Sequence, residues 1–197
     1  MKKLHLNIIT IASLTLAILL CGLTNSFAQA KYHTQTINLK VNGTSSLHDW
    51  EMTSTSGLFD ASISIANNKV SFTGLSFTVP AESLKSGHGL MDKNTYKALN
   101  TGKNPNISFV LSSGVVSQTG ENTYQLKGMG KLTIAGTTIE TDLVAMLKYN
   151  PADKTFSCTG TKKFKMTQYG VKPPTVMMGA IKTGDDISIS YTLVIKS

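Results

Sequence analysis

Hydrophobic and polar residues alternate along most of this chain. Residues 185–195 (DDISISYTLVI) place large apolar side chains at every second position, with serine or threonine between them. Residues 155–166 (TFSCTGTKKFKM) divide in the same way, with Phe156, Cys158, Phe164 and Met166 on one side and Ser157, Thr159, Thr161, Lys163 and Lys165 on the other. A period of two predicts strands with one buried and one solvated face. The same pattern marks residues 33–41, 45–54, 57–65, 69–79, 106–113, 122–134 and 138–149.

About eight or nine strands with little helix between them are typical of an antiparallel sandwich or barrel. Gly74, Gly128 and Gly130 interrupt the alternation, and we expect bulges or bends there that curl the sheet. Curling favours the barrel. The predicted fold is therefore all-β, an antiparallel β-barrel of about eight strands.

One segment departs from the two-residue period. Residues 91–100 carry apolar side chains at roughly helical spacing, Asp92 is a candidate N-cap, and Gly102 and Pro105 end the pattern. We expect one short helix here, across or beside the barrel. Because the sequence has no internal repeat, low-complexity tract or linker, it indicates one domain, residues 31–197.

The first 30 residues have the three parts of a secretory signal peptide. A cationic start is followed by an apolar run over about residues 8–23 and by an A-x-A motif at Ala28 and Ala30. Cleavage between Ala30 and Lys31 is expected. This predicts a periplasmic or secreted protein with no stable membrane span after cleavage.

Two other fates of the leader remain open. A retained membrane anchor is one, although the apolar run is at the short end for a span. Lipoprotein processing at Cys21 is the other, although Leu20 before it is bulkier than such sites usually accept.

The charge of the chain comes from lysine. All 19 basic residues are lysines, and with 11 acidic residues they give a formal net charge of +8. Proteins that read nucleic acids usually show arginine forks and stacking aromatics on one basic face, whereas these lysines are scattered among acids, so no nucleic-acid partner is expected. Cys158 is the only cysteine outside the leader, which leaves the apolar core to hold the fold.

Two clusters invite a catalytic or metal hypothesis. Ser45, His48 and Asp49 resemble parts of a hydrolase triad, but adjacent side chains of a strand point to opposite faces and the G-x-S-x-G motif is missing. His88 and Asp92 have a spacing that suits a metal on a helix, but glycines flank His88 and indicate a loop. We expect no enzyme activity, no metal, and no cofactor other than a bound lipid.

The barrel interior is expected to be apolar. The inward-facing candidates are aliphatic or aromatic: Trp50, Phe59, Ile63, Phe72, Phe109, Leu126, Leu132, Leu143, Leu147, Tyr149, Phe156, Phe164, Tyr191 and Leu193. A barrel of this size is either filled by its side chains or wide enough for one small ligand. Small residues at Ala61, Ala145 and Gly160 favour a cavity, whereas plain core packing is the simpler hypothesis for each large residue alone.

One predicted loop is unusually apolar. Residues 172–184 (KPPTVMMGAIKTG) carry Val176, Met177, Met178 and Ile181, although loops are normally polar. Flexible thioethers adapt to a flexible ligand, so this loop could line or close an apolar cavity at a barrel mouth. The alternative is that it plugs the barrel end.

An ordered series of motifs covers the chain: a strand ending in PAESL, a histidine-containing turn, MDKNTYKALNTGKNPNISF, a strand, and a GKLTIAGTT hairpin. Together with residues 43–65, 70–113, 130–147 and 164–195, this series resembles the YceI-like family over about residues 33–195. That family comprises bacterial secreted, lipocalin-like proteins associated with polyisoprenoid and lipid binding.

The resemblance implies an elongated, lipocalin-like barrel whose apolar tunnel holds a polyisoprenoid, quinone or fatty-acyl chain. It places His48 and Trp50 at a family position for a histidine and an aromatic, and His88, Met91 and Tyr96 in the histidine turn and short helix. The ligand-binding side chains expected from the pattern and the resemblance are His48, Trp50, Phe59, Phe72, His88, Met91, Tyr96, Phe109, Leu143, Phe156, Phe164, Met177, Met178 and Tyr191.

This chain departs from the family pattern in the turn over residues 167–170, where Gln168 stands in place of an acid. The function expected is non-catalytic binding or transport of a long apolar lipid in the barrel. The first alternative is a filled barrel with a structural or interaction role, stress-related and without a lipid ligand. A weaker hypothesis is a metal- or haem-related accessory protein that uses His48 or His88. A homodimer is compatible with the sequence and not required by it.

Overall fold

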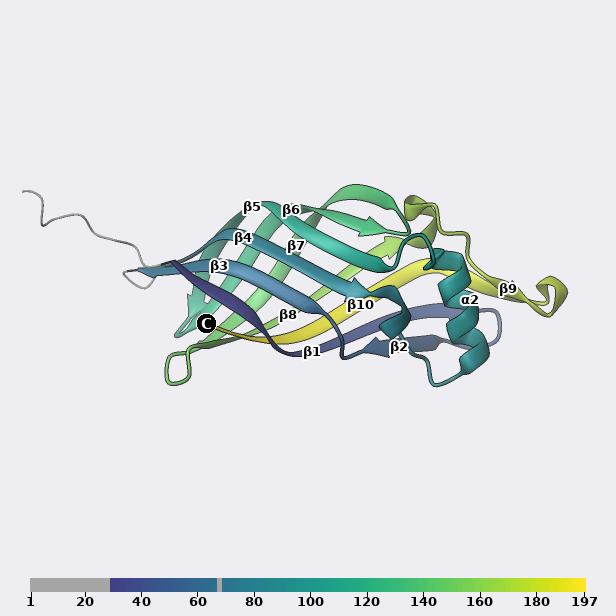
Figure 1. The fold of residues 1–197 in the computed structure, drawn as a ribbon, viewed down its shortest axis with the longest axis horizontal. Helices are drawn as coiled ribbons and strands as arrows, with labels where there is room; N and C mark the ends of the chain where they lie inside the picture. Colours follow the sequence, from purple (N-terminus) through teal and green to yellow (C-terminus); the bar gives the residue numbers. More distant parts are fainter. Residues whose placement is uncertain (1–28, 67–68) are drawn as a thin grey trace, which may run out of the picture.

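The described part of the chain, residues 29–66 and 69–197 of a computed structural model, contains ten strands, one α-helix and three short 3₁₀-helices (Figure 1). The strands are β1 (Gln29–Ser45), β2 (Trp50–Ser54), β3 (Leu58–Ala66), β4 (Lys69–Pro80), β5 (Asn106–Gly120), β6 (Thr123–Ile134), β7 (Thr137–Asn150), β8 (Thr155–Lys165), β9 (Thr175–Val176) and β10 (Ile181–Lys196). The helices are η1 (Ala81–Ser83), α2 (Gly89–Leu99), η2 (Met166–Tyr169) and η3 (Met177–Gly179). Apart from Gln29 and Ala30, which lie in β1, the predicted leader falls outside the described residues.

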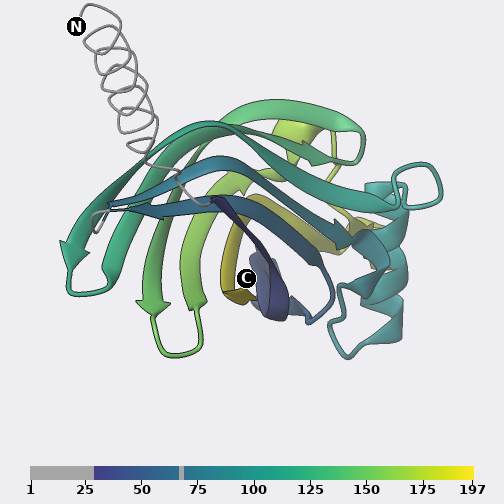
Figure 2. The ribbon, with the colours of Figure 1, turned by 60° about the vertical axis from the view of Figure 1, so that its left-hand side comes forward.

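The sheet closes on itself. Each strand pairs antiparallel with the next in the order β1-β3-β4-β5-β6-β7-β8-β10, and β10 pairs back onto β1. β3 pairs with residues 29–33 of β1, and β2 pairs with residues 39–43 of the same strand. β2 and β3 therefore occupy one position in the barrel wall, with a break between them. The result is a closed eight-stranded antiparallel barrel, as the alternation predicted, and its strands curl around a common interior (Figure 2).

The predicted helix is present, but it begins at Gly89 rather than residue 91, and His88 rather than Asp92 is the N-cap. The Asp92 carboxylate instead accepts hydrogen bonds from the amide and hydroxyl of Ser86, at 2.8 and 2.7 Å. α2 lies at the same end of the barrel as β2 and β9 (Figure 1). Within residues 29–66 and 69–197, no helix is long and apolar enough to cross a membrane.

Two predicted boundaries were wrong. Residues 46–49, assigned to a strand by their alternation, form a turn, because the Ser45 hydroxyl accepts the amides of Leu47 and His48 and donates to the His48 carbonyl. Residues 172–184 are not one loop, since β9 and η3 lie within them and Ile181 already begins β10.

Register shifts lie at Gly74 and Gly130, two of the three glycines where bulges or bends were predicted, whereas Gly128 pairs with Gly114 in regular register. The β3–β4 register shifts between Ser62 and Ile63, beside Gly74, and the β5–β6 register shifts between Leu111 and Ser113, opposite Gly130. Each shift inserts an extra residue in one strand, which bends and twists that strand locally.

The core follows the period of two. All fourteen side chains predicted to point inward belong to the buried cluster or pack against it. At the end opposite α2, Phe156 is fully buried, with its ring centroid 5.4 Å from that of Tyr32 and 4.7 Å from that of Tyr149. These three rings pack against one another in the core near that end.

Candidate ligand-binding cavities

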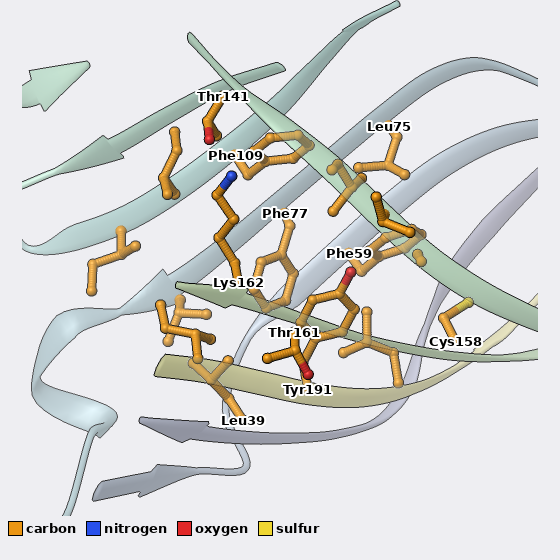
Figure 3. A pocket seen from close by; sticks show the side chains of 18 of the residues that line it. Leu39, Phe59, Leu75, Phe77, Phe109, Thr141, Cys158, Thr161, Lys162 and Tyr191 are labelled. Atoms are coloured by element: carbon orange, nitrogen blue, oxygen red, sulfur yellow. The ribbon is translucent and has the colours of Figure 1, made fainter. Parts of the chain in front are cut away.

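The middle of the barrel encloses a cavity of about 130 Å³, here called the interior cavity. Aromatic rings contribute much of its wall: Phe59 from β3, Phe77 from β4, Phe109 from β5 and Tyr191 from β10 (Figure 3). Aliphatic side chains from β1, β6, β7 and the other strands complete it. A cavity with this lining favours hydrocarbon over water.

A larger space of about 390 Å³, the mouth cavity, lies where α2 meets the barrel end. Trp50 at the start of β2 and Met91 and Leu99 of α2 border it, and Val176 and Ile181 of the β9–β10 segment border it opposite. The Trp50 indole donates to the Thr44 carbonyl at 3.0 Å, which fixes the ring at this position. The wall is apolar with a polar rim, the usual character of small-molecule sites.

Phe164 and Ile187 separate the two cavities. Along β10, residues 189, 191 and 193 line the interior cavity and residues 181 and 183 line the mouth cavity, while Ile187 lies between and borders neither. Phe164 is the β8 partner of Ile187, and its ring packs edge-on against Tyr169 at 5.1 Å. A long chain occupying both cavities would have to pass these side chains.

Nine of the fourteen predicted ligand-binding residues border one of the cavities. Phe59, Phe72, Phe109, Leu143 and Tyr191 line the interior cavity. His48, Trp50, His88 and Met91 line the mouth cavity.

The other five lie elsewhere for identifiable reasons. Phe156 belongs to the ring cluster at the far end, and Phe164 stands between the cavities. The Tyr96 hydroxyl is held by the Leu84 carbonyl at 2.8 Å and by the Lys85 ammonium at 2.6 Å, so this residue ties α2 to the preceding loop. Met177 and Met178 are 74% and 109% exposed and line neither cavity.

The methionines face solvent because of their backbone. Met177 and Met178 have φ values of 52° and 55°, the left-handed region that side chains rarely adopt, and this turn directs them away from the barrel. Other residues of the same segment do face the mouth cavity: Pro174, Val176 and Ile181. The segment therefore lines the mouth with its aliphatic residues, not with its thioethers.

The sequence matches the YceI-like domain family over residues 24–195. This chain belongs to the YceI-like family. Its fold is shared with BcnA of Burkholderia cenocepacia at 18% identity and a TM-score of 0.62, covering 80% of this chain and 95% of BcnA.

Two further structures share this YceI-like fold. A polyisoprenoid-binding domain from Saccharophagus degradans, implicated in plant cell wall breakdown, matches at 10% identity and a TM-score of 0.58, covering 84% of this chain and 98% of that domain. A YceI protein of Campylobacter jejuni matches at 17% identity and a TM-score of 0.50, covering 71% of this chain and 82% of that protein. No curated protein matches this chain.

The candidate hydrolase and metal residues of this YceI-like chain have local structural partners. Ser45 caps its turn, and His48 Nδ1 lies 2.7 Å from the Asp49 carbonyl oxygen. The Asp92 carboxylate is engaged by Ser86, as described for the start of α2, and this hydrogen bonding lowers its pKa. None of these contacts is the hydroxyl-to-imidazole bond that activates a nucleophile.

Asp185 supplies a contact that the sequence analysis missed. In the turn over residues 167–170, where the family resemblance implies an acid, the Thr167 amide and hydroxyl donate to the Asp185 carboxylate at 2.9 and 2.7 Å. These hydrogen bonds lower the pKa of Asp185. Gln168 accepts the Lys165 amide at 2.9 Å, so an acid from β10 and an amide from the turn together hold this strand end.

Few polar groups reach the interior cavity. Burial raises the pKa of the Cys158 thiol to about 12, and burial together with Cys158 raises the pKa of Tyr191. Both groups are therefore neutral at physiological pH. A third polar side chain at this cavity is Lys162, which the sequence analysis did not predict. Lys162 lies at an inward-facing position of β8, and its ammonium pairs with Asp142 of β7.

Proposed function

We propose that this chain binds or transports a long apolar lipid, without catalysis, by enclosing the lipid's hydrocarbon chain in the barrel. The observation that carries the proposal is the pair of apolar cavities arranged along the barrel, one in its middle and one at its mouth. The polyisoprenoid-binding domain of Saccharophagus degradans, which has the same fold, supports a polyisoprenoid, quinone or fatty-acyl chain as the ligand class.

The cavity volumes bear on the size of this lipid. The interior cavity of about 130 Å³ is smaller than typical ligand pockets and holds only part of a long chain. Each buried methylene contributes about 0.8 kcal/mol before the cost of association, so affinity is expected to rise with the number of methylenes that enter the cavities. A lipid that fills only the interior cavity binds weakly, whereas one that also fills the mouth cavity of about 390 Å³ binds tightly.

The alternative function is a filled barrel that serves as a structural or interaction module. The small interior cavity favours it, because typical ligand pockets have about 300–1,000 Å³. The exposed Met177 and Met178 side chains would then form part of a docking surface. Lipid binding accounts better for the presence of two apolar cavities along one barrel.

The leader pattern of residues 1–30 supports a periplasmic or secreted location for this activity. In such a compartment, a carrier that encloses an apolar chain would keep the chain out of water between membranes or enzymes.

The test has two parts. Protein purified gently from a bacterial periplasm is extracted with organic solvent, and the extract is analysed by mass spectrometry. Delipidated protein is then titrated with 1-alkanols of increasing chain length. A stoichiometric lipid in the extract, and an affinity that rises with the chain length of the alkanol, are the results expected. Protein that carries no lipid and takes up none of the alkanols would contradict the proposal and favour the filled barrel.

A further inference from the structure

The barrel wall has an opening between β7 and β8. In the described part of the chain, the ladder between these strands runs only from Asn150↔Thr155 to Ala145↔Gly160. Beyond that point β7 continues paired to β6, and β8 continues paired to β10. The two strands therefore part. We call the space between residues 137–144 of β7 and residues 161–165 of β8 the β7–β8 window.

The window is bounded at its far end. The η2 turn follows β8, and a Cβ built on Gly170 would lie 3.6 Å from the Thr137 hydroxyl, so this turn packs beside the start of β7. The opening is thus closed by a ladder at one end and by a turn at the other.

The window reaches the interior cavity. By strand alternation Asp142 and Val144 of β7 and Thr161 of β8 point away from the barrel axis, and all three are exposed. All three nevertheless border the interior cavity. Because the β7–β8 ladder ends at Ala145↔Gly160, these residues place the edge of the cavity at the gap between the two strands.

Lys162 stands at this window. It shares the inward-facing parity of Cys158 and Phe164, and its side chain lines the interior cavity while remaining 25% exposed. Figure 3 shows this side chain extending toward β7, in the direction of Thr141. Its ammonium donates to the carboxylate of Asp142, whose side chain is 67% exposed. The pair bridges the window, with a long aliphatic stem inside and both charges at the outer edge.

The Lys162–Asp142 pair contributes little to the fold. An exposed ion pair stabilises a protein only weakly, and an apolar side chain at an inward-facing position would serve the core at least as well. What Lys162 offers is a cation at the edge of an otherwise hydrocarbon cavity. An amphiphile with an apolar chain and an anionic end matches that arrangement, because its headgroup can replace the Asp142 carboxylate on the ammonium.

We propose that the β7–β8 window admits a lipid with an anionic headgroup, and that Lys162 binds this headgroup in exchange for Asp142 while the chain fills the interior cavity. The inference rests on the proposed lipid-binding function and narrows the ligand class to anionic amphiphiles. The shared chemistry is a carboxylate or a phosphate at the end of a long hydrocarbon chain.

The test compares ligands with the same chain and different headgroups. Isothermal titration calorimetry is run with dodecanoate against 1-dodecanol, and with farnesyl phosphate against farnesol. We expect the wild-type protein to bind at least one anionic ligand about tenfold more tightly than its alcohol, with an advantage that shrinks as salt is added. Preference for dodecanoate alone would identify a fatty acid, and preference for farnesyl phosphate alone an isoprenoid phosphate.

Three variants separate headgroup binding from a merely structural role. In Lys162→Met the anionic preference is lost while alcohol affinity is kept. In Lys163→Met, which removes a lysine from the outer face of the same strand, the preference stays. In Asp142→Asn the affinity for the anionic ligand rises a few-fold, because no carboxylate competes for the ammonium.

The outcomes distinguish the two proposals. Equal affinities for alcohol and anion in the wild-type protein, or an anionic preference that survives in Lys162→Met, would overturn the headgroup site and leave the lipid carrier standing. Binding of neither ligand of either pair would remove the carrier and, with it, this inference.

Discussion

Tyr191 of β10 lies directly over Gly160, its pairing partner on β8. A Cβ built on Gly160 would stand 2.2 Å from the Tyr191 hydroxyl oxygen and 2.4 Å from the ring carbon that carries it. The missing side chain at residue 160 therefore leaves the space that the tyrosine occupies beside the interior cavity. A small residue on one strand thus sets where an aromatic ring of the next strand stands.

Gly160→Ala is expected to push the Tyr191 ring toward the cavity. Overpacking of this kind costs about 1–3 kcal/mol, and the displaced ring would also weaken lipid binding. Urea denaturation measures the loss. Gly74→Ala is the matched control, because a Cβ at Gly74 meets nothing within 4 Å. Equal losses of stability in the two variants would show that the contact with Tyr191 is not the cause of the loss in Gly160→Ala.

Trp50 is expected to report on the mouth cavity. It is the only tryptophan and borders this cavity, so a quinone whose chain extends from the interior into the mouth should quench its emission. A short alkanol that fills only the interior cavity should leave the emission unchanged. The measurement is a fluorescence titration, with binding of the same quinone to Trp50→Phe measured by calorimetry as the control. Quinone binding without quenching would place the chain away from the mouth.

Cys158 is expected to be inert in the folded protein. Burial raises its thiol pKa to about 12, so at pH 8 almost none of it is the reactive thiolate. A chromogenic disulfide reagent should therefore react slowly with native protein and rapidly in urea. Fast reaction under native conditions would mean that the Cys158 thiol becomes accessible far more often than its burial allows.

Stability should fall in alkaline solution. The Cys158 thiol has an ordinary pKa of 9.0 and a folded value of about 12, so the unfolded chain loses this proton first as pH rises. The contribution of the neutral thiol is fully present below pH 9 and is lost as pH rises toward 12. Burial likewise raises the pKa of Tyr32, Tyr169 and Tyr191, which acts in the same direction.

Urea denaturation across this alkaline range, compared between the native sequence and Cys158→Ala, measures how much of the pH-dependent loss of stability comes from Cys158. The variant should lose less stability with rising pH than the native sequence does. Identical pH slopes would contradict a buried, neutral thiol.

Met178→Gly should preserve lipid binding and slightly stabilise the fold. Met178 is fully exposed with φ at 55°, where glycine avoids a cost of about 1 kcal/mol. Met52, only 2% exposed, is the contrast, since Met52→Ala should cost about 2–5 kcal/mol. Thermal denaturation and alkanol titration measure both effects. A marked loss of lipid affinity in Met178→Gly would restore the hypothesis that the methionines of residues 172–184 line or close the cavity at the barrel mouth.

Much of the barrel could be predicted because its information is local. The pleat sends alternate side chains to opposite faces, so the period of two identified every strand of the closed barrel, and every side chain predicted to point inward belongs to the core or packs against it. The ends of these strands were less predictable where a side chain forms hydrogen bonds with the backbone. At the end of β1, for example, the Ser45 hydroxyl donates to the His48 carbonyl.

The candidate site was only partly predictable, because two of its features depend on geometry beyond any one strand. Alternation does place Lys162 on the inward face, but its meaning depends on where the β7–β8 ladder ends, which is a property of the closed sheet. The methionines were predicted to line a cavity from their chemistry alone, whereas two left-handed residues in succession turn them outward.

The pairing of β1 with β10 also governs how the barrel is completed. Residues near His33 and near Lys196 are partners, although almost the whole described chain separates them. Contacts between such distant segments form slowly and late. Until β10 is available, the intermediate is an open sheet whose two free edges, on β1 and β8, can pair with another chain. The barrel therefore cannot close until β10 is available, and a chain that lacks β10 should aggregate instead of folding.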